Sequence, residues 1–354
     1  MRVMQLIDSM DAGGAERIAV TFANSLVDQA EASHLCVTRA EGVLKDQLNP
    51  EVLFHFLKKR STLDLGAVVG LRRYLKLHKI RVIHAHTTSY FFATLVKLSY
   101  PKIKLIWHTH LGERVQTNGR HNIVLYVCSL FFSAIITVNE ELRSWCSRYL
   151  ATRNVYYLPN FVQRNKFPEG AGMNREDSIV CLANLKSPKN HLNLIEAFQK
   201  VSKVFPHWKL LLIGKDFKDA YSENLKETIK NTGLQNKVVF LGQQSEVETL
   251  LIKSSIGVLA SDSEGLPMAL LEYGAAELAA VATHVGHCKE VIGDFGKVVP
   301  AQDANALAEA LLDYISNTER RKTQAARFKE HVRKHYSVEV VLPQLITIYN
   351  NTAH

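Results

Sequence analysis

The chain has 354 residues, 47% hydrophobic and 22% charged, which is typical of a soluble globular protein long enough for two domains. It contains no apolar stretch of the roughly 18–20 uncharged residues that a membrane span needs, and an acidic residue precedes any long apolar run, which argues against a signal peptide. The five cysteines are scattered without a C-x-x-C pair, so we expect reduced thiols in a cytoplasm, and neither a disulfide scaffold nor a zinc knuckle.

The net charge of +9 is unevenly distributed. Residues 1–165 contain 21 Lys and Arg against 12 Asp and Glu, whereas residues 166–354 contain 22 of each. A basic half can bind nucleic acid or an anionic membrane surface. Because no RNP run, zinc finger or basic zipper accompanies the charge, we favour the membrane surface and expect no nucleic-acid partner.

The first predicted strand, residues 2–8, leads through Gly13 and Gly14 into an apolar-periodic helix over residues 18–26. A strand, a glycine pair and a helix let the backbone approach a phosphate closely. By itself the glycine pair is weak evidence, because an ordinary tight turn gives the same pattern.

Two further strands in the first half are predicted to end in histidines. Residues 82–86 end in His84 and His86, and residues 104–107 are followed by His108 and His110. Alternate residues on a strand share a face, so each pair can point one way. A metal-dependent hydrolase is one interpretation, although no third-ligand motif such as H-E-x-x-H is found. The other is that these histidines act as donors to substrate hydroxyls or developing charge.

We interpret two helical stretches nearby as structural. Residues 63–78 carry several basic side chains, which usually mark a solvated helix face. Residues 123–132 are apolar on nearly every side, and we favour a helix buried between the sheet and its neighbours over one that docks on a membrane.

The second half repeats the strand–helix alternation after a polar linker at residues 163–177. A strand at residues 178–185 is followed by Lys189, which directly precedes a helix at residues 192–204. A lysine ahead of a helix N-terminus opposes the helix dipole unless an anion shares the site, so Lys189 is a candidate ligand of a diphosphate. The alternation as a whole predicts parallel sheets in a doubly wound α/β arrangement.

Residues 256–276 carry the densest group of candidate site residues. An apolar strand ends in the polar turn 261–263, Glu264 follows, and Gly265-Leu266-Pro267 opens a helix that carries Glu272. The free N–H groups of a first helical turn can receive a phosphate or sugar oxygen, and a carboxylate nearby can accept from ribose hydroxyls. Two acids spaced in this way could hold both sugars of a nucleotide-sugar, but a surface Glu and a capping Glu give the same pattern.

The segment from Glu264 to Glu272, followed by residues 281–283, 285–286 and 290–292, closely resembles the E-x7-E segment of the retaining glycosyltransferases of family 4. The resemblance covers nearly the whole chain, including the G-G-A-E wording at residues 13–16, the residues 159–162 and Lys189. This sequence departs from the family pattern at four positions. Glu277, Ala279 and His287 stand where the family has Gly, Pro and Gly, and Asn184 stands where it has Arg.

The resemblance implies the GT-B fold, in which two Rossmann-like, doubly wound α/β domains face each other across a cleft. The first would bind the acceptor (residues 1–165), the second the nucleotide-sugar (residues 166–336), and a helix at residues 337–354 would cross back to the first. The residues implied as catalytic are His108, Glu264 and Lys189. Those implied in donor binding are Gly13, Gly14, Asn184, Lys189, Gln243, Glu264, Gly265, Leu266, Pro267 and Glu272, and those implied in acceptor binding are His84, His86 and Arg114.

The function implied is retaining transfer of a sugar from a UDP-, GDP- or ADP-sugar to an acceptor hydroxyl, with no metal or other cofactor. We expect a lipid-linked glycan acceptor in bacterial surface-polysaccharide assembly, at the inner face of the cell membrane. Three alternatives stay open: a nucleotide-sugar epimerase, a metal-dependent hydrolase, and a non-catalytic nucleotide-sugar-binding protein.

Overall fold

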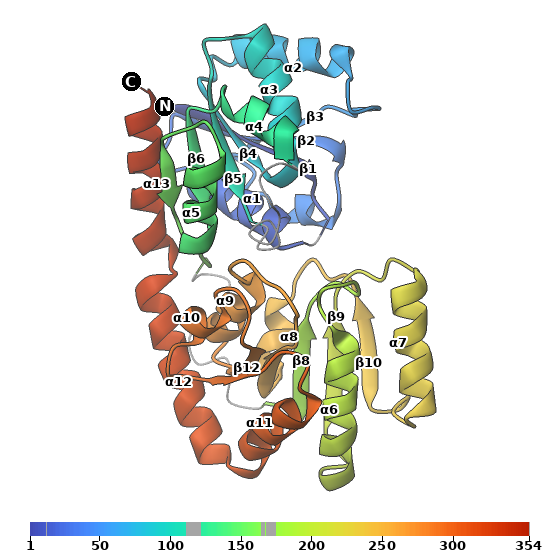
Figure 1. Ribbon diagram of the computed structural model, residues 1–354. Coiled ribbons are helices and arrows are strands. Elements are labelled where there is room, and N and C mark those ends of the chain that lie inside the picture. The colour runs from blue at the N-terminus through green and yellow to red at the C-terminus, as the bar shows by residue number, and fades with distance from the viewer. Residues whose placement is uncertain (12, 111–121, 164–166, 168–174, 354) are drawn as a thin grey trace. The chain divides into compact units, whose positions relative to one another are not determined.

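The computed structural model describes residues 1–11, 13–110, 122–163, 167 and 175–353, and the chain divides into two compact units (Figure 1). Unit 1 consists of Met1–Asn160 and Val338–His354, and unit 2 of Phe161–Ser337. Among the described residues, no helix has both the length and the apolar character that a membrane span requires.

Unit 1 is built on a seven-stranded sheet whose neighbouring strands are all parallel. In sheet order the strands are β3 (Leu53–Phe56), β2 (Ala32–Ala40), β1 (Arg2–Ser9), β4 (Val82–His86), β5 (Lys104–Thr109), β6 (Ala134–Thr137) and β7 (Val155–Tyr157). The direction in which successive strands are added reverses between β1 and β4. In open α/β sheets, ligands bind beyond the carboxyl ends of the strands at such a reversal.

Helices cover both faces of this sheet (Figure 1). They are α1 (Gly14–Ser25), α2 (Leu65–Leu77), α3 (Tyr90–Ser99), α4 (Ile123–Ser129), α5 (Glu140–Tyr149) and α13 (Val338–Ala353), with short 3-10 turns η1 (Val43–Gln47) and η2 (Thr87–Ser89). Successive side chains of a strand point to opposite faces. Met4 and Leu6 of β1 therefore pack in the core formed with α2 to α5, whereas Ile7 packs in the core formed with α1.

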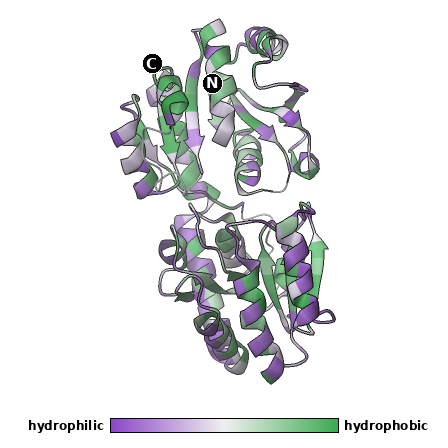
Figure 2. Cartoon of the chain, turned by 45° about the vertical axis from the view of Figure 1, so that its right-hand side comes forward, coloured by the Kyte–Doolittle hydropathy of each residue, from purple (hydrophilic) through white to green (hydrophobic). Residues whose placement is uncertain are grey.

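Unit 2 contains a six-stranded parallel sheet of the same kind. In sheet order its strands are β10 (Val238–Gly242), β9 (Lys209–Ile213), β8 (Ser178–Leu182), β11 (Ile256–Leu259), β12 (Ala279–Thr283) and β13 (Lys297–Val299). Its helices are α6 (His191–Val204), α7 (Ala220–Asn231), α8 (Glu248–Lys253), α9 (Met268–Ala275), α10 (Cys288–Ile292), α11 (Ala304–Ser316) and α12 (Thr318–His335). Figure 2 shows largely hydrophobic strands and hydrophilic outer helix faces. The direction in which successive strands are added to this sheet reverses between β8 and β11.

Helix α4 contradicts the expectation of a helix buried between the sheet and its neighbours. Leu125 is buried in the core, but Ile123, Val124, Tyr126 and Val127 are 69%, 51%, 47% and 50% exposed. A short helix on the outside of a sheet can pack only one stripe of its surface, so the apolar residues on its other side stay in solvent.

Three of the departures from the family pattern lie after α9, at residues 277, 279 and 287. Two of these residues have backbone conformations that any residue adopts. His287 has a φ of −94°, and Ala279 is the first residue of β12. Glu277 differs, because its φ of 57° is in the left-handed region that favours glycine. Its side chain accepts from Lys329 Nζ at 2.8 Å, an ion pair that partly offsets the strain.

Candidate active site

Lys189 and Glu264 lie together in unit 2, beyond the ends of the two strands at which the strand order reverses. Lys189 follows β8 and Glu264 follows β11, and Lys189 Nζ is 2.6 Å from Glu264 Oε1. Ser261 Oγ donates to the same carboxylate oxygen at 2.6 Å. An ammonium group has three N–H donors, so the bond to Glu264 leaves Lys189 with the capacity to bind an anion as well.

The loops that carry these two residues are fastened to each other. Asn190, at a left-handed φ of 47°, caps α6 by accepting from Asn193 N, and its Nδ2 donates to Asp262 Oδ1 at 2.8 Å. The Asp262 N–H in turn donates to Pro188 O at 2.8 Å. The sequence marked residues 261–263 only as a polar turn. The contacts show that Ser261 orients Glu264 and that Asp262 fixes the loop of Lys189.

The stretch Gly265-Leu266-Pro267 leads into α9 as expected, although Pro267 sits one residue before the helix, in extended backbone with φ −75° and ψ 118°. Residues 286 and 287 contact the backbone of this loop. His287 N–H donates to Gly265 O at 3.0 Å, and a Cβ on Gly286, whose φ is 48°, would lie 2.1 Å from Glu264 O. Only glycine fits this close approach, which explains Gly286 in the motif.

Glu272 is buried in α9, whose position is fixed by the neighbouring Tyr273. The Tyr273 hydroxyl accepts from Leu182 N–H at 2.7 Å and donates to Val258 O at 3.1 Å. One side chain thus ties α9 to the ends of β8 and β11, and burial raises the pKa of its hydroxyl well above the usual value. Sequence reasoning missed Tyr273, because an aromatic residue in an apolar helix gives no signal of such a role.

Asn184 and Gln243 lie at the ends of β8 and β10. The Asn184 side-chain oxygen accepts from Lys215 N–H at 2.8 Å, so part of its amide holds the loop after β9. Gln243 Nε2 is buried and has no hydrogen-bond partner among the described residues.

In unit 1, Gly13 is the N-cap of α1 and Gly14 its first residue, at the end of the loop that follows β1. Residue 12 lies outside the described residues, and so does Arg114, which the resemblance implies in acceptor binding.

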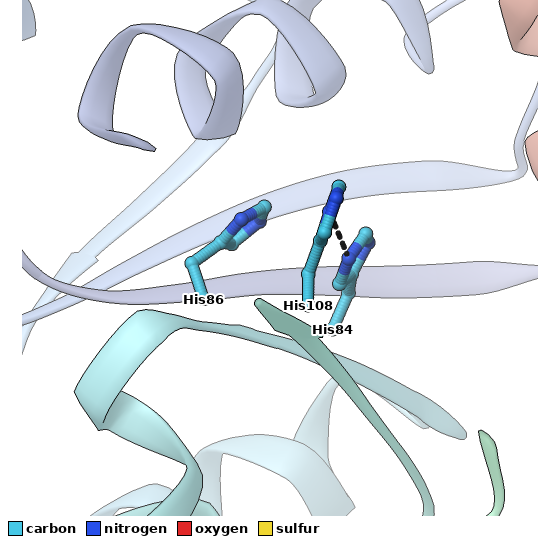
Figure 3. Close-up of side chains that lie close together, drawn as sticks. All are labelled: His84, His86 and His108. Carbon is cyan, nitrogen blue, oxygen red and sulfur yellow. Dashed lines mark hydrogen bonds between the residues drawn. The ribbon is translucent and has the colours of Figure 1, made fainter. Parts of the chain in front are cut away.

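Three of the predicted histidines, His84, His86 and His108, lie close together in unit 1 (Figure 3). His84 and His86 come from β4 and His108 from β5, with His86 and His108 opposite each other in the strand register. His84 Nε2 is 3.1 Å from His108 Nδ1, and His86 Nδ1 is 3.2 Å from His110 Nε2. Desolvation by burial lowers the pKa of His84 and of His110 to about 3 and that of His86 and His108 well below 6.5. The rings are therefore neutral at neutral pH.

Two residues that the sequence did not indicate complete this cluster. Gln5 of β1 lies with Oε1 2.8 Å from His86 Nε2 and with Nε2 3.1 Å from the hydroxyl of Tyr349, from α13. The same hydroxyl is 2.6 Å from His84 Nδ1. All these side chains are buried.

The three nitrogen-bearing side chains His84, His86 and His108 are also close enough to be considered as metal ligands, with one nitrogen of each within 4.8 Å of the others. Their hydrogen bonds argue against it. His84 Nε2 pairs with His108 Nδ1 at 3.1 Å, and His86 Nε2 pairs with Gln5 Oε1 at 2.8 Å, so these nitrogens already have partners within the protein. The arrangement fits a hydrogen-bonded network better than a metal centre.

Two family models match the chain. One, described as Glycosyltransferase Family 4, matches residues 12–166, and the other, described as Glycosyl transferases group 1, matches residues 163–334. Each covers one half, and together they extend from residue 12 to residue 334.

Curated relatives are about a quarter identical to the chain over the residues that align. The N-acetyl-alpha-D-glucosaminyl L-malate synthase of Bacillus anthracis is 27% identical over 197 residues, which are 55% of this chain and 50% of that protein. The match thus spans half the length of that relative. A Campylobacter jejuni protein, GalNAc-alpha-(1->4)-GalNAc-alpha-(1->3)-diNAcBac-PP-undecaprenol alpha-1,4-N-acetyl-D-galactosaminyltransferase, is 23% identical and aligns over 94% of each chain.

Among solved structures, the crystal structure of Anabaena HepE in complex with UDP and glucose superimposes with a TM-score of 0.85 at 18% identity, covering 99% of this chain and 100% of that one. A similarity at this identity establishes the fold. The expected fold class, the GT-B arrangement of two parallel α/β sheets, is confirmed.

Proposed function

Because the chain belongs to family 4 of the glycosyltransferases, we propose that it transfers a sugar from a nucleotide-diphosphate donor to an acceptor hydroxyl with retention of the anomeric configuration. The observation that carries the proposal is the pairing of Lys189 with Glu264 beyond β8 and β11. This is the place in an open α/β sheet where a charged ligand is expected. A cation and a carboxylate there match the two parts of a nucleotide-sugar, its diphosphate and its hydroxyls.

The roles follow from the chemistry of each group. Lys189 and the backbone N–H groups of Gly265 and Leu266 stabilise the leaving diphosphate, as positioned donors do for developing negative charge. Glu264 accepts from the hydroxyls of the donor sugar and Glu272 from the ribose. Gln243 Nε2 offers its unpaired N–H to the base. His108 contacts the donor sugar, which is the role that the family resemblance implies.

The reaction breaks the bond between the anomeric carbon and the diphosphate oxygen and forms one to the acceptor oxygen on the same face of the sugar. The acceptor proton passes to an oxygen of the departing diphosphate, so no protein base is required. An oxocarbenium-like centre forms between the two bonds, and the fixed charges of the site stabilise it without a metal.

The test is transfer from a panel of UDP-, GDP- and ADP-sugars to a lipid-linked glycan, in excess EDTA, by wild type, Lys189→Ala and Glu272→Ala. Loss of one such charged contact in the transition state slows transfer by about 100-fold or more. Lys186→Ala is the matched control, because Lys186 lies in the same loop and is exposed. Full activity in both site variants, or loss of activity in EDTA, would refute these roles.

We also propose that unit 1 docks on an anionic membrane surface, where a lipid-linked acceptor resides. The net positive charge lies in residues 1–165, and α4 exposes apolar side chains beside α3. Each Lys or Arg near an anionic bilayer contributes roughly 1 kcal/mol of attraction, and an exposed apolar stripe adds burial in the headgroup region. The undecaprenol-linked acceptor in the name of the Campylobacter relative supports this choice of acceptor.

Co-sedimentation with phosphatidylglycerol vesicles tests the docking. We expect binding at low salt that weakens at high salt, and weaker binding of Val124→Ser/Val127→Ser, which changes only exposed positions. Val204→Ser is the control, because Val204 is exposed to a similar degree in unit 2. Absence of binding to anionic vesicles at low salt would refute the proposal.

A further inference from the structure

We propose that Gln5, Tyr349 and His84 are positioning residues that hold His108 in the neutral tautomer with its proton on Nε2, so that this N–H is the donor His108 offers to the nucleotide-sugar. What His108 contacts rests on the proposed function. The tautomer itself is a property of unit 1 and can be tested without any turnover.

Gln5 sets the donor-to-acceptor direction of the chain of hydrogen bonds that leads to His108. Its Oε1 only accepts and lies 2.8 Å from His86 Nε2, so His86 carries its proton on Nε2. Its Nε2 only donates and lies 3.1 Å from the Tyr349 hydroxyl, so the hydroxyl oxygen accepts from Gln5. The branch to His110 agrees, because His86 Nδ1 is then free to accept from His110 Nε2 at 3.2 Å.

The chain then passes through Tyr349 to His84. The hydroxyl accepts from Gln5, and its own proton points to His84 Nδ1 at 2.6 Å. A neutral imidazole has one N–H, and the burial and lowered pKa of His84 keep the ring neutral. His84 therefore carries its proton on Nε2.

The last step fixes His108. His84 Nε2 lies 3.1 Å from His108 Nδ1 and donates to it, so the proton of His108 is on Nε2. Along the path from His86 through Gln5 and Tyr349 to His84, every donor has one acceptor. The hydrogen-bond chain ends at His108 Nε2. This nitrogen is buried and has no hydrogen-bond partner among the described residues. A buried donor without an acceptor is costly, and an oxygen of the substrate would satisfy it.

A purely structural cluster, which only fastens α13 to β1 and β4, would give the same distances. The two explanations differ in what they predict when the donor and acceptor roles along the hydrogen-bond chain are exchanged. In Gln5→Glu the side chain keeps its shape, but a carboxylate only accepts. Tyr349 would then donate to position 5 and accept from His84 Nδ1, His84 Nε2 would accept from His108 Nδ1, and His108 Nε2 would become an acceptor.

The experiment is ¹⁵N NMR of the full chain with ¹⁵N-labelled histidine, assigned with single His→Gln variants, together with steady-state kinetics. In wild type we expect His108 with its proton on Nε2. Gln5→Glu moves the proton to Nδ1, and Tyr349→Phe gives a mixture of both tautomers. In Tyr349→Phe we expect kcat to fall by about tenfold, the equivalent of one lost hydrogen bond in the transition state, with Kd for UDP changed by less than about twofold.

Tyr74→Phe is the matched control. It removes another tyrosine–histidine hydrogen bond of unit 1, the one between the Tyr74 hydroxyl and His34 Nδ1 at 3.1 Å, and leaves the hydrogen-bond chain to His108 intact. Its His108 signals and its kcat should equal those of wild type. A wild-type His108 protonated on Nδ1, or tautomers unchanged in both Gln5→Glu and Tyr349→Phe, would overturn the inference. A wild type with the expected tautomer that uses no nucleotide-sugar would support the assignment and refute the proposed function instead.

Discussion

Acid should destabilise unit 1 well before the carboxylates of the protein are protonated. A histidine whose folded pKa lies below its unfolded value takes up a proton on unfolding whenever the pH lies between the two. For His84 and His110 the pKa is lowered from 6.5 to about 3, mainly by burial. Their contribution to stability is complete above pH 6.5 and declines as the pH falls toward 3.

The size of the effect follows from the two pKa values. At pH 5, which is 1.5 units below 6.5, each histidine costs about 2 kcal/mol, since one unit corresponds to about 1.4 kcal/mol. The two together remove about 4 kcal/mol between pH 7 and pH 5, a large part of the roughly 5–15 kcal/mol that stabilises a typical domain. His86 and His108, whose pKa is also lowered, act in the same direction.

The assay is urea unfolding at pH 7 and pH 5, followed by tryptophan fluorescence in a Trp208→Phe background. Of the three tryptophans, Trp107 and Trp145 lie in unit 1 and Trp208 in unit 2, so this background reports unit 1. His110→Gln removes one titrating ring and should reduce the loss between the two pH values by about 2 kcal/mol. An equal loss in His110→Gln and wild type would show that His110 does not contribute to the acid response.

Three further predictions concern unit 2. Glu277→Gly removes backbone strain worth about 1 kcal/mol, but also the ion pair with Lys329, worth about 0.2–1 kcal/mol. Urea unfolding of this variant should therefore show equal or slightly higher stability than wild type. Glu277→Ala loses the ion pair and keeps the strain, so it should be less stable. Tyr273→Phe leaves the Leu182 N–H without its acceptor and should lower the free energy of unfolding by about 1–3 kcal/mol, and an unchanged midpoint would contradict the role of Tyr273 in fixing α9. Glu264→Gln removes the negative charge that competes with a diphosphate for Lys189. Calorimetry should then show that UDP binds several-fold more tightly, while transfer slows. Weaker UDP binding would show that the diphosphate does not bind at Lys189.

The positions of Lys189 and Glu264 could be predicted because each depends on local sequence. Both follow a short apolar strand that ends in turn residues, and parallel strands bring their carboxyl ends to one edge of a sheet. That the two side chains contact each other at 2.6 Å could not be predicted, because it depends on how Asn190 and Asp262 join their loops. In α4, an apolar sequence on every side of the helix could not show which side faces the core.

The pairing of Gln5, Tyr349 and His84 could not be predicted for a different reason. Gln5 and Tyr349 are 344 residues apart, and neither belongs to a motif. Within an apolar strand and an apolar helix, a single polar side chain is costly to bury unless a partner satisfies it. A buried Gln in β1 and a buried Tyr in α13 therefore each require a polar partner, and His86 and His84 of β4 provide it. The same requirement that stabilises the cluster also orders its protons, so the C-terminal helix and the first strand act on His108 through His84.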